Sequence, residues 1–203
     1  MLEAAGLDCE RSGRTLFRGL TFSLARGELL RIGGPNGSGK TSLLRILCGL
    51  LAPTQGEVRW RGTPIRRLAE EYSRDLVYIG HASALKDDLT PYENLDIACR
   101  LAGVPAHREA LAEALGTFAV PELPARKLSQ GQRRRAALAR LLVSEGVPLW
   151  LLDEPFAALD AAAASYAEEV IARHLKAGGS VVYTTHQQAG LDSSARVIDL
   201  AVH

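Results

Sequence analysis

Apolar and polar residues alternate along the first part of the chain in the pattern typical of half-buried strands. Leu20, Phe22 and Leu24 repeat with a period of two, and polar or glycine-containing interruptions occur at residues 11–14 and 25–27. Such interruptions accommodate hairpin turns, so we predict antiparallel strands before residue 33.

Farther along the chain most apolar runs are continuous. Uninterrupted apolarity over residues 147–152 indicates a central parallel strand that is covered on both faces. Leu43, Leu44 and Leu47 lie at helical spacing, which predicts a helix that opens near Lys40. Because strands and helices alternate, we predict an α/β fold with a parallel sheet. The predicted elements are strands at 29–32, 57–61, 75–79, 147–152, 180–185 and 196–201, and helices at 40–50 and 160–176.

Helical patterns dominate from about 91 to 145 and break this alternation. Thr90 followed by Pro91 is typical of a helix N-cap and first turn. We therefore predict one domain over residues 1–203 that contains a helical subdomain at about 91–145. Its expected buried apolar anchors are Leu101, Leu111 and Leu115.

Composition narrows the class of protein but does not identify it. The 203 residues are 47% hydrophobic and 23% charged, which is ordinary for a soluble globular protein. The net charge of +1 favours neither nucleic acid nor an anionic membrane as a partner. No apolar run approaches the roughly 18 residues that a membrane span needs. The N-terminus does not resemble a secretory signal, and Cys9, Cys48 and Cys99 lack disulfide or metal spacing, so we expect a cytoplasmic location.

Residues 34–41, GPNGSGKT, match the phosphate-loop pattern G-x-x-x-x-G-K-[ST] between a predicted strand and a predicted helix. Main-chain amides of such a loop and the positive end of the helix form an anion site. We expect Lys40 to contact the β- and γ-phosphates of ATP and Thr41 to bind Mg²⁺, for which Ser42 is a weaker candidate. The predicted nucleotide-binding residues here are Gly34, Pro35, Asn36, Gly37, Ser38, Gly39, Lys40, Thr41 and Ser42.

Two acids stand at the end of the central apolar strand. Asp153 is suited to hold the Mg²⁺ that bridges the nucleotide phosphates, and Glu154 is suited to orient or deprotonate the attacking water. The simpler interpretation is a pair of acids that closes a strand before Pro155. The phosphate loop elsewhere in the chain favours the catalytic interpretation.

The segment 128–132, LSQGQ, precedes a helix rich in Arg, Ala and Leu. Ser129 and Gly131 could present a hydroxyl, amides and a helix dipole to an anion, or Ser129 could simply cap the helix. Local reasoning leaves both interpretations open. The next three residues are basic, and we expect a solvated edge or an intersubunit contact rather than nucleic-acid binding; they are Arg133, Arg134 and Arg135.

The chain as a whole resembles the ATP-binding cassette (ABC) ATPases. The matching motifs, in the family's order, are GPNGSGKT (34–41), LSQGQ (128–132), LWLLDEP (149–155), ALD (158–160) and His186 after a strand. The resemblance implies a P-loop fold with an antiparallel β edge and an α-helical subdomain, Mg²⁺-dependent ATP hydrolysis, and membrane subunits supplied by other chains.

The same resemblance implies how copies of the chain assemble. Two of them would pack head to tail, so that ATP lies between the phosphate loop of one and the signature turn of the other, formed by Ser129, Gln130 and Gly131. It implies Glu154 as general base, His186 as a contact to the γ-phosphate and Asp160 at the dimer contact.

Two positions depart from the family pattern. Most members carry a Gln that reaches Mg²⁺ and the attacking water where this chain has His81. A neutral imidazole can also meet a metal or a water. Where members carry an aromatic residue that stacks on adenine, this chain has Arg11, whose guanidinium plane could stack instead or could simply be surface.

The segment 78–95, with Gly80-His81 followed by Asn94-Leu95, resembles the CcmA family, the ATP-binding subunits of the bacterial haem exporter of cytochrome c biogenesis. This resemblance implies CcmB- and CcmC-like membrane partners, a peripheral position on the cytoplasmic face of the inner membrane, and ATP-driven release of a haem-loaded chaperone. The alternatives are the ATPase of a lipid, drug or peptide exporter and a soluble ABC ATPase that acts on nucleic acid.

Overall fold

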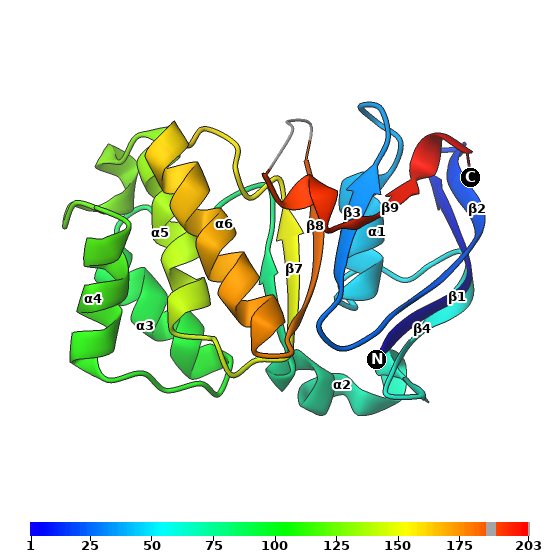
Figure 1. Ribbon diagram of the computed structural model, residues 1–203, viewed down its shortest axis with the longest axis horizontal. Helices are drawn as coiled ribbons and strands as arrows, with labels where there is room; N and C mark the ends of the chain where they lie inside the picture. The colour runs from blue at the N-terminus through cyan, green and yellow to red at the C-terminus, as the bar shows by residue number, and fades with distance from the viewer. Residues whose placement is uncertain (186–189, 203) are drawn as a thin grey trace.

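The computed structural model describes residues 1–185 and 190–202, which build two β-sheets (Figure 1). The first sheet is antiparallel and has the strand order β2-β1-β4-β5. Its hairpin turns at Ser12 and Gly13, whose φ angles of 51° and 73° are those of a tight primed turn. The predicted N-terminal hairpin is therefore confirmed. The strands are β1 (Leu2–Arg11), β2 (Arg14–Leu24), β4 (Gln55–Trp60) and β5 (Thr63–Pro64).

The second sheet is parallel throughout and has the strand order β6-β7-β8-β3-β9. Parallel strands place their carboxyl ends at one edge, so the residues that follow β3, β6 and β7 meet there although they are far apart in sequence. This edge positions the candidate site. The strands are β3 (Leu29–Gly33), β6 (Leu76–Ile79), β7 (Leu149–Asp153), β8 (Ser180–Thr184) and β9 (Arg196–Asp199).

Helices cover both faces of the parallel sheet, as the continuous apolar strands predicted. One face packs on α1 (Lys40–Leu47), which lies between the two sheets and contacts β1, β7 and β8. The other face packs on α6 (Ala161–Lys176), which contacts β8 and lies beside β7 in Figure 1. Alternate residues of β7 therefore enter two different cores: Leu149 and Leu151 join the first, and Trp150 and Leu152 join the second.

Three helices, α3 (Pro91–Leu101), α4 (Arg108–Thr117) and α5 (Gln130–Leu142), pack against one another at the end of the molecule away from the antiparallel sheet (Figure 1). Leu111 and Leu115 are buried as predicted, but the prediction for Leu101 is wrong because its side chain is 83% exposed. Each helical residue turns the chain by about 100°, so Leu101 points away from the face that buries Cys99 two positions earlier.

The helix α2 (Ile65–Arg74) was not predicted. Its large apolar residues are Ile65, Leu68 and Tyr72, and they lie at helical spacing. Tyr72 is buried and donates a hydrogen bond to the carbonyl of Leu47 at 2.7 Å, which ties α2 to α1. Within residues 1–185 and 190–202, no helix combines the length and apolarity that a membrane crossing requires.

Candidate functional site

The loop between β3 and α1 is held in backbone conformations that only glycine adopts readily. Gly34 has a φ of 130°, and a Cβ atom there would lie 2.6 Å from Ser38 Oγ. Gly39, with a φ of 102°, is the N-cap of α1, and a Cβ there would lie 3.1 Å from Leu16 Cβ. The glycines of the motif are therefore required both by the turn and by the close approach of neighbouring atoms.

Lys40 is the first residue of α1, and its side chain folds back over this loop. Its ammonium group donates hydrogen bonds to the carbonyls of Gly34 at 2.8 Å and Pro35 at 3.0 Å, and the residue is only 7% exposed. Burial lowers the pKa of Lys40, while the carboxylates of Glu154, Asp153 and, less strongly, Asp199 raise it. The loop thus places a positive charge at the start of α1, where the helix dipole also favours an anion.

The loop opens into a pocket with a volume of about 590 Å³. The pocket is formed by the phosphate loop, the start of α1 and the residues that follow β6 and β7, so segments distant in the sequence converge as the parallel sheet requires. Its lining residues are Leu16, Asn36, Gly37, Gly39, Lys40, Thr41, Ser42, His81, Asp153, Glu154 and Ala157.

Asp153 closes the pocket from the end of β7 and is 1% exposed. Its Oδ1 atom accepts a hydrogen bond from the hydroxyl of Thr184 at 2.8 Å on the neighbouring strand β8. Its Oδ2 atom is buried and has no hydrogen-bond partner among the described residues. A buried carboxylate oxygen without a donor is costly unless a cation or water meets it. Together with the Thr41 hydroxyl on the same pocket, it forms an oxygen ligand set that fits Mg²⁺.

Glu154 follows in a left-handed backbone conformation with a φ of 52°. A non-glycine residue in this conformation costs roughly 1–3 kcal/mol and is characteristic of functional sites. Its amide donates a hydrogen bond to Thr184 Oγ1 at 2.9 Å. The abrupt turn after Asp153 brings the second carboxylate to the pocket as well, because both acids line it.

Arg134 is the site residue that the sequence analysis misplaced. It is 3% exposed, not part of a solvated edge or an intersubunit contact, and its guanidinium donates to three main-chain carbonyls. These belong to Gly80 at 2.9 Å, Asp153 at 2.8 Å and Glu154 at 2.7 Å. Burial lowers the pKa of Arg134, and the nearby Asp153 and Glu154 carboxylates raise it. Helical spacing with Leu138 could have revealed the buried side chain, because residues four apart share a face.

Ser129 caps α5 within its own chain, which is the simpler of the two interpretations left open above. Its hydroxyl accepts a hydrogen bond from the amide of Gln132 at 3.2 Å, and the Gln132 side chain accepts one from the amide of Ser129 at 2.8 Å. Gly131 packs so closely on the carbonyl of Ala158 that a Cβ would lie 2.5 Å from it. Asp160, two residues on, accepts from the amide of Ala163 at 2.8 Å and caps α6. The turn of Ser129, Gln130 and Gly131 does not line the pocket of its own chain.

The remaining predicted residues are His81, Arg11 and His186. His81 is exposed and lines the pocket. Arg11 is exposed at the end of β1, opposite Arg14, and Leu16 rather than Arg11 lines the pocket. Adenine stacking by Arg11 therefore stays a prediction. His186 lies outside the described residues.

The ABC transporter family model matches residues 17–157, which is more than half of the chain and contains the phosphate loop, the signature turn, Asp153 and Glu154. The chain belongs to the ABC transporter family. It is accordingly an ATP-hydrolysing ABC transporter subunit. The matched residues include the phosphate loop and the two acids that line the pocket at the edge of the parallel sheet.

Curated relatives in the ABC family extend over almost the entire chain. A protein named cytochrome c biogenesis ATP-binding export protein CcmA from Aromatoleum aromaticum is 52% identical, over 99% of this chain and 95% of its own. The protein of the same name from Nitrosomonas europaea is 52% identical, over 93% of this chain and 89% of its own.

Solved ABC structures share the fold. An ABC transporter ATP-binding protein from Pyrococcus furiosus superposes with a TM-score of 0.83 at 25% identity, covering 100% of this chain and 98% of that one. The ATP-binding cassette MJ0796, a dimer in a post-hydrolysis state with ADP and Pi, also has a TM-score of 0.83 at 24% identity, covering 98% and 94%. These likenesses support the predicted ABC nucleotide-binding fold.

Proposed function

We propose that this chain is the ATP-hydrolysing subunit of the haem exporter of cytochrome c biogenesis. The observation that carries the proposal is the 52% identity to proteins named as ATP-binding export proteins of cytochrome c biogenesis, over nearly the full length of both chains. The same name recurs at 44% identity in Methylococcus capsulatus, over 98% of this chain. We treat residues 1–203 as one cassette with a helical subdomain at about 91–145.

The pocket residues suggest a division of labour in ATP hydrolysis. Lys40 and the loop amides would bind the β- and γ-phosphates and stabilise the charge that develops on the transferred phosphoryl group. Thr41 and Asp153 would hold Mg²⁺, which neutralises phosphate charge when bound, and His81 would contact the metal or the water next to it. Glu154 would orient the attacking water and accept its proton.

A second copy of the chain would complete the site. The signature turn formed by Ser129, Gln130 and Gly131 caps its own helix and lies outside the pocket of its own chain. The amides at the start of α5 would then face the γ-phosphate held by a partner in a head-to-tail homodimer. Asp160 would lie at the dimer contact, and His186 would reach the γ-phosphate.

We infer that membrane subunits on other chains complete the transporter, as the description of the relatives as export proteins suggests. We propose CcmB- and CcmC-like partners, a peripheral position on the cytoplasmic face of the bacterial inner membrane, and release of a haem-loaded chaperone as the step that consumes ATP.

A complementation experiment tests the proposal. A bacterium that lacks its own CcmA is expected to regain haem-stained c-type cytochromes when it expresses this chain together with CcmB- and CcmC-like proteins from the same organism as this chain. The Glu154→Gln variant, expressed at the same level, should not restore them. If the purified chain hydrolyses ATP but the cytochromes do not return, the chain serves another exporter.

A further inference from the structure

We propose that Arg134 is a positioning residue for ATP hydrolysis, which fixes the signature helix α5 to the catalytic ends of β6 and β7 and thereby sets the placement of Glu154. The proposal rests on the general-base role proposed for Glu154. It starts from an unusual arrangement, in which one buried guanidinium donates to the carbonyls of Gly80, Asp153 and Glu154 at 2.9, 2.8 and 2.7 Å.

Both main-chain polar groups of Glu154 are held by side chains from other elements. Thr184 on β8 accepts from its amide at 2.9 Å, and Arg134 on α5 donates to its carbonyl at 2.7 Å. Because Glu154 has a left-handed φ of 52°, its peptide would relax toward a common conformation if these contacts were lost. The two contacts therefore determine where the Glu154 carboxylate enters the pocket.

Arg134 also reaches the other strand end at the pocket. Its Nη1 atom bonds Gly80, the residue immediately before His81, while its Nη2 atom bonds the carbonyls of Asp153 and Glu154. A planar guanidinium has rigid donor directions, so it fixes the separation of the two strand ends. Beyond the ladder that pairs β6 with β7, Arg134 therefore braces the two strand ends from which His81 and Glu154 enter the pocket.

The position of Arg134 on α5 links this geometry to the signature turn. Arg134 lies in the second turn of a helix that begins at Gln130, so a shift of the turn moves the guanidinium with it. Binding of a partner's nucleotide to the signature turn would therefore move Arg134. Through Arg134 it would also affect the position of Glu154 in the chain that carries the turn. Arg134 itself is buried and does not line the pocket, so the connection passes through a side chain outside the binding surface.

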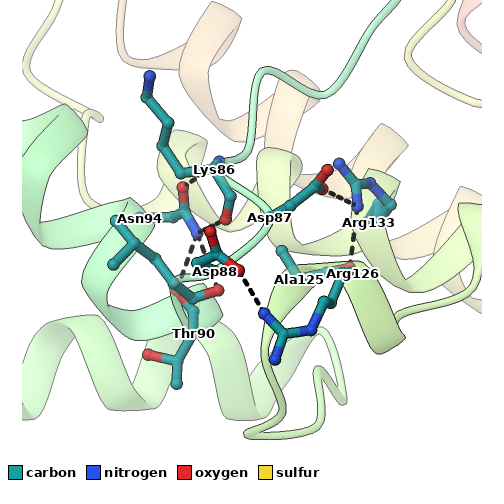
Figure 2. Close-up of polar contacts among 9 residues, drawn as sticks. Lys86, Asp87, Asp88, Thr90, Asn94, Ala125, Arg126 and Arg133 are labelled. Atoms are coloured by element: carbon teal, nitrogen blue, oxygen red, sulfur yellow. Dashed lines mark hydrogen bonds and ion pairs between the residues drawn. The ribbon is translucent and has the colours of Figure 1, made fainter.

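The neighbouring Arg133 provides a matched comparison. Adjacent helical residues point about 100° apart, and Arg133 faces the segment before α3 instead (Figure 2). Its Nη1 atom bonds Asp87 Oδ1 at 2.8 Å and the carbonyl of Ala125 at 2.9 Å. The Asp87 side chain is 64% exposed, so this ion pair lies at the surface and contributes little.

The experiment compares Arg134→Gln, Arg134→Lys and Arg133→Gln in the purified full-length chain, with melting temperature as a check on folding. We expect Arg134→Gln to lower kcat for ATP hydrolysis by roughly 30-fold, because small displacements of catalytic groups have large effects on rate, while KM for ATP changes less than about threefold. Arg134→Lys, which keeps the charge but not the three-way geometry, should fall between it and the parent. Arg133→Gln should stay within about twofold of the parent.

A double-mutant cycle with Glu154→Gln separates positioning from general stability. If Arg134 acts through Glu154, adding Arg134→Gln or Arg134→Lys to Glu154→Gln should lower the residual turnover by less than about threefold. A full additional loss in the double variant would overturn the proposal. So would an unchanged kcat in both Arg134 variants, or an equal loss in Arg133→Gln.

The outcome also distinguishes this inference from the function on which it rests. If Glu154→Gln alone leaves turnover intact, the proposed role of Glu154 fails. If Glu154→Gln abolishes turnover while Arg134→Lys and Arg134→Gln match the parent, only the role of Arg134 fails. A failure of complementation with normal ATP hydrolysis affects neither residue assignment, because both are measured on the isolated chain.

Discussion

The nucleotide pocket and the segment that leads into α3 differ in whether their buried polar atoms have hydrogen-bond partners. Asp153 Oδ2 in the pocket and Ser38 Oγ in the phosphate loop beside it are buried without a hydrogen-bond partner among the described residues. In the segment before α3, Asn94 bonds the main chain of Lys86, Leu89 and Thr90 (Figure 2). Ion pairs join Asp87 to Arg133 and Asp88 to Arg126 in the same view.

The difference follows from what each region has to bind. Asn94 is surrounded by partners from its own chain, so its amide organises a turn and needs nothing further. Asp153 and Lys40 are placed where the chain supplies only part of their contacts, and the missing partners are charged groups of a ligand. A buried polar group that lacks a partner beside a glycine loop therefore indicates a ligand site, whereas one with all its hydrogen bonds made indicates a role in holding the fold together.

The largest expected effect concerns the pocket. Glu154→Gln preserves the shape of the side chain but removes the proposed base, so kcat for ATP hydrolysis should fall by at least about 100-fold. Binding of ATP, measured by equilibrium titration with a fluorescent analogue, should remain within about threefold of the parent because the phosphate contacts stay. Turnover close to that of the parent would contradict the assignment of Glu154.

The second prediction concerns the stability of the fold and depends on His174, a buried titratable residue away from the pocket. His174 on α6 stacks on Trp150 with ring centroids 3.6 Å apart, and burial lowers its pKa to about 4, although main-chain groups of Glu145 and Ser180 partly oppose this. In the unfolded chain the pKa of a histidine is about 6.5, so acidification protonates the unfolded state first. The free energy of unfolding should be unaffected above pH 6.5 and should fall by roughly 2–3 kcal/mol between pH 6.5 and 4.

Urea unfolding at a series of pH values measures this dependence. His174→Asn removes the titration along with the stacking, so that variant should be less stable at neutral pH but should lose less stability on acidification. Equal slopes for the two proteins would show that His174 does not hold its proton off in the folded state. The same region contains Trp150 Nε1, which is buried without a hydrogen-bond partner among the described residues, so an unsatisfied group alone does not make a ligand site.

The segment before α3 provides the converse test. Asn94→Ala leaves the main-chain groups of Lys86 and Thr90 without their partner, which should cost about 2 kcal/mol of stability. ATP affinity should not change, because this segment stabilises the fold and does not line the nucleotide pocket. Asp96→Ala on the same helix removes only the surface ion pair with Arg100 and should cost about 0.5 kcal/mol. A loss of ATP affinity in Asn94→Ala that its stability does not explain would contradict the comparison.

The smallest effect concerns the base of the nucleotide. Arg11→Ala should raise the dissociation constant for ATP by roughly threefold, which is the magnitude of a stacking contact at an exposed site. Arg14→Ala, which removes the facing charge of the same hairpin, is the matched control and should leave the affinity unchanged. Equal affinities in all three proteins would return Arg11 to the ordinary surface.

Local chemistry could be predicted from the sequence because its determinants are contiguous. The phosphate loop is a run of eight residues, and its glycines and Lys40 form the anion site without help from distant parts of the chain. Thr90, Pro91 and Glu93 likewise define the start of α3 within four residues, and the structure contains the complete capping box. The continuous apolar run of β7 predicted a strand covered on both faces, and its residues alternate between two cores.

Which way individual side chains point was harder to predict, because that depends on neighbours distant in the sequence. Leu101 looked like a core residue and is exposed, since it points away from the face of α3 that buries Cys99. Arg134 looked like one of three surface arginines and is buried, since β6 and β7 present their carbonyls to that side of α5.

The sequence by itself determined the α/β architecture, the phosphate loop and the two acids at the end of β7, because each follows from local periodicity or from a short run of residues. Only the tertiary structure decided that Thr184 and Arg134 hold Glu154 from opposite sides and that the signature turn lies outside its own pocket. The two contacts to Glu154 join residues that are 30 and 20 positions apart in the chain. Their geometry is set by the packing of the parallel sheet rather than by any local preference.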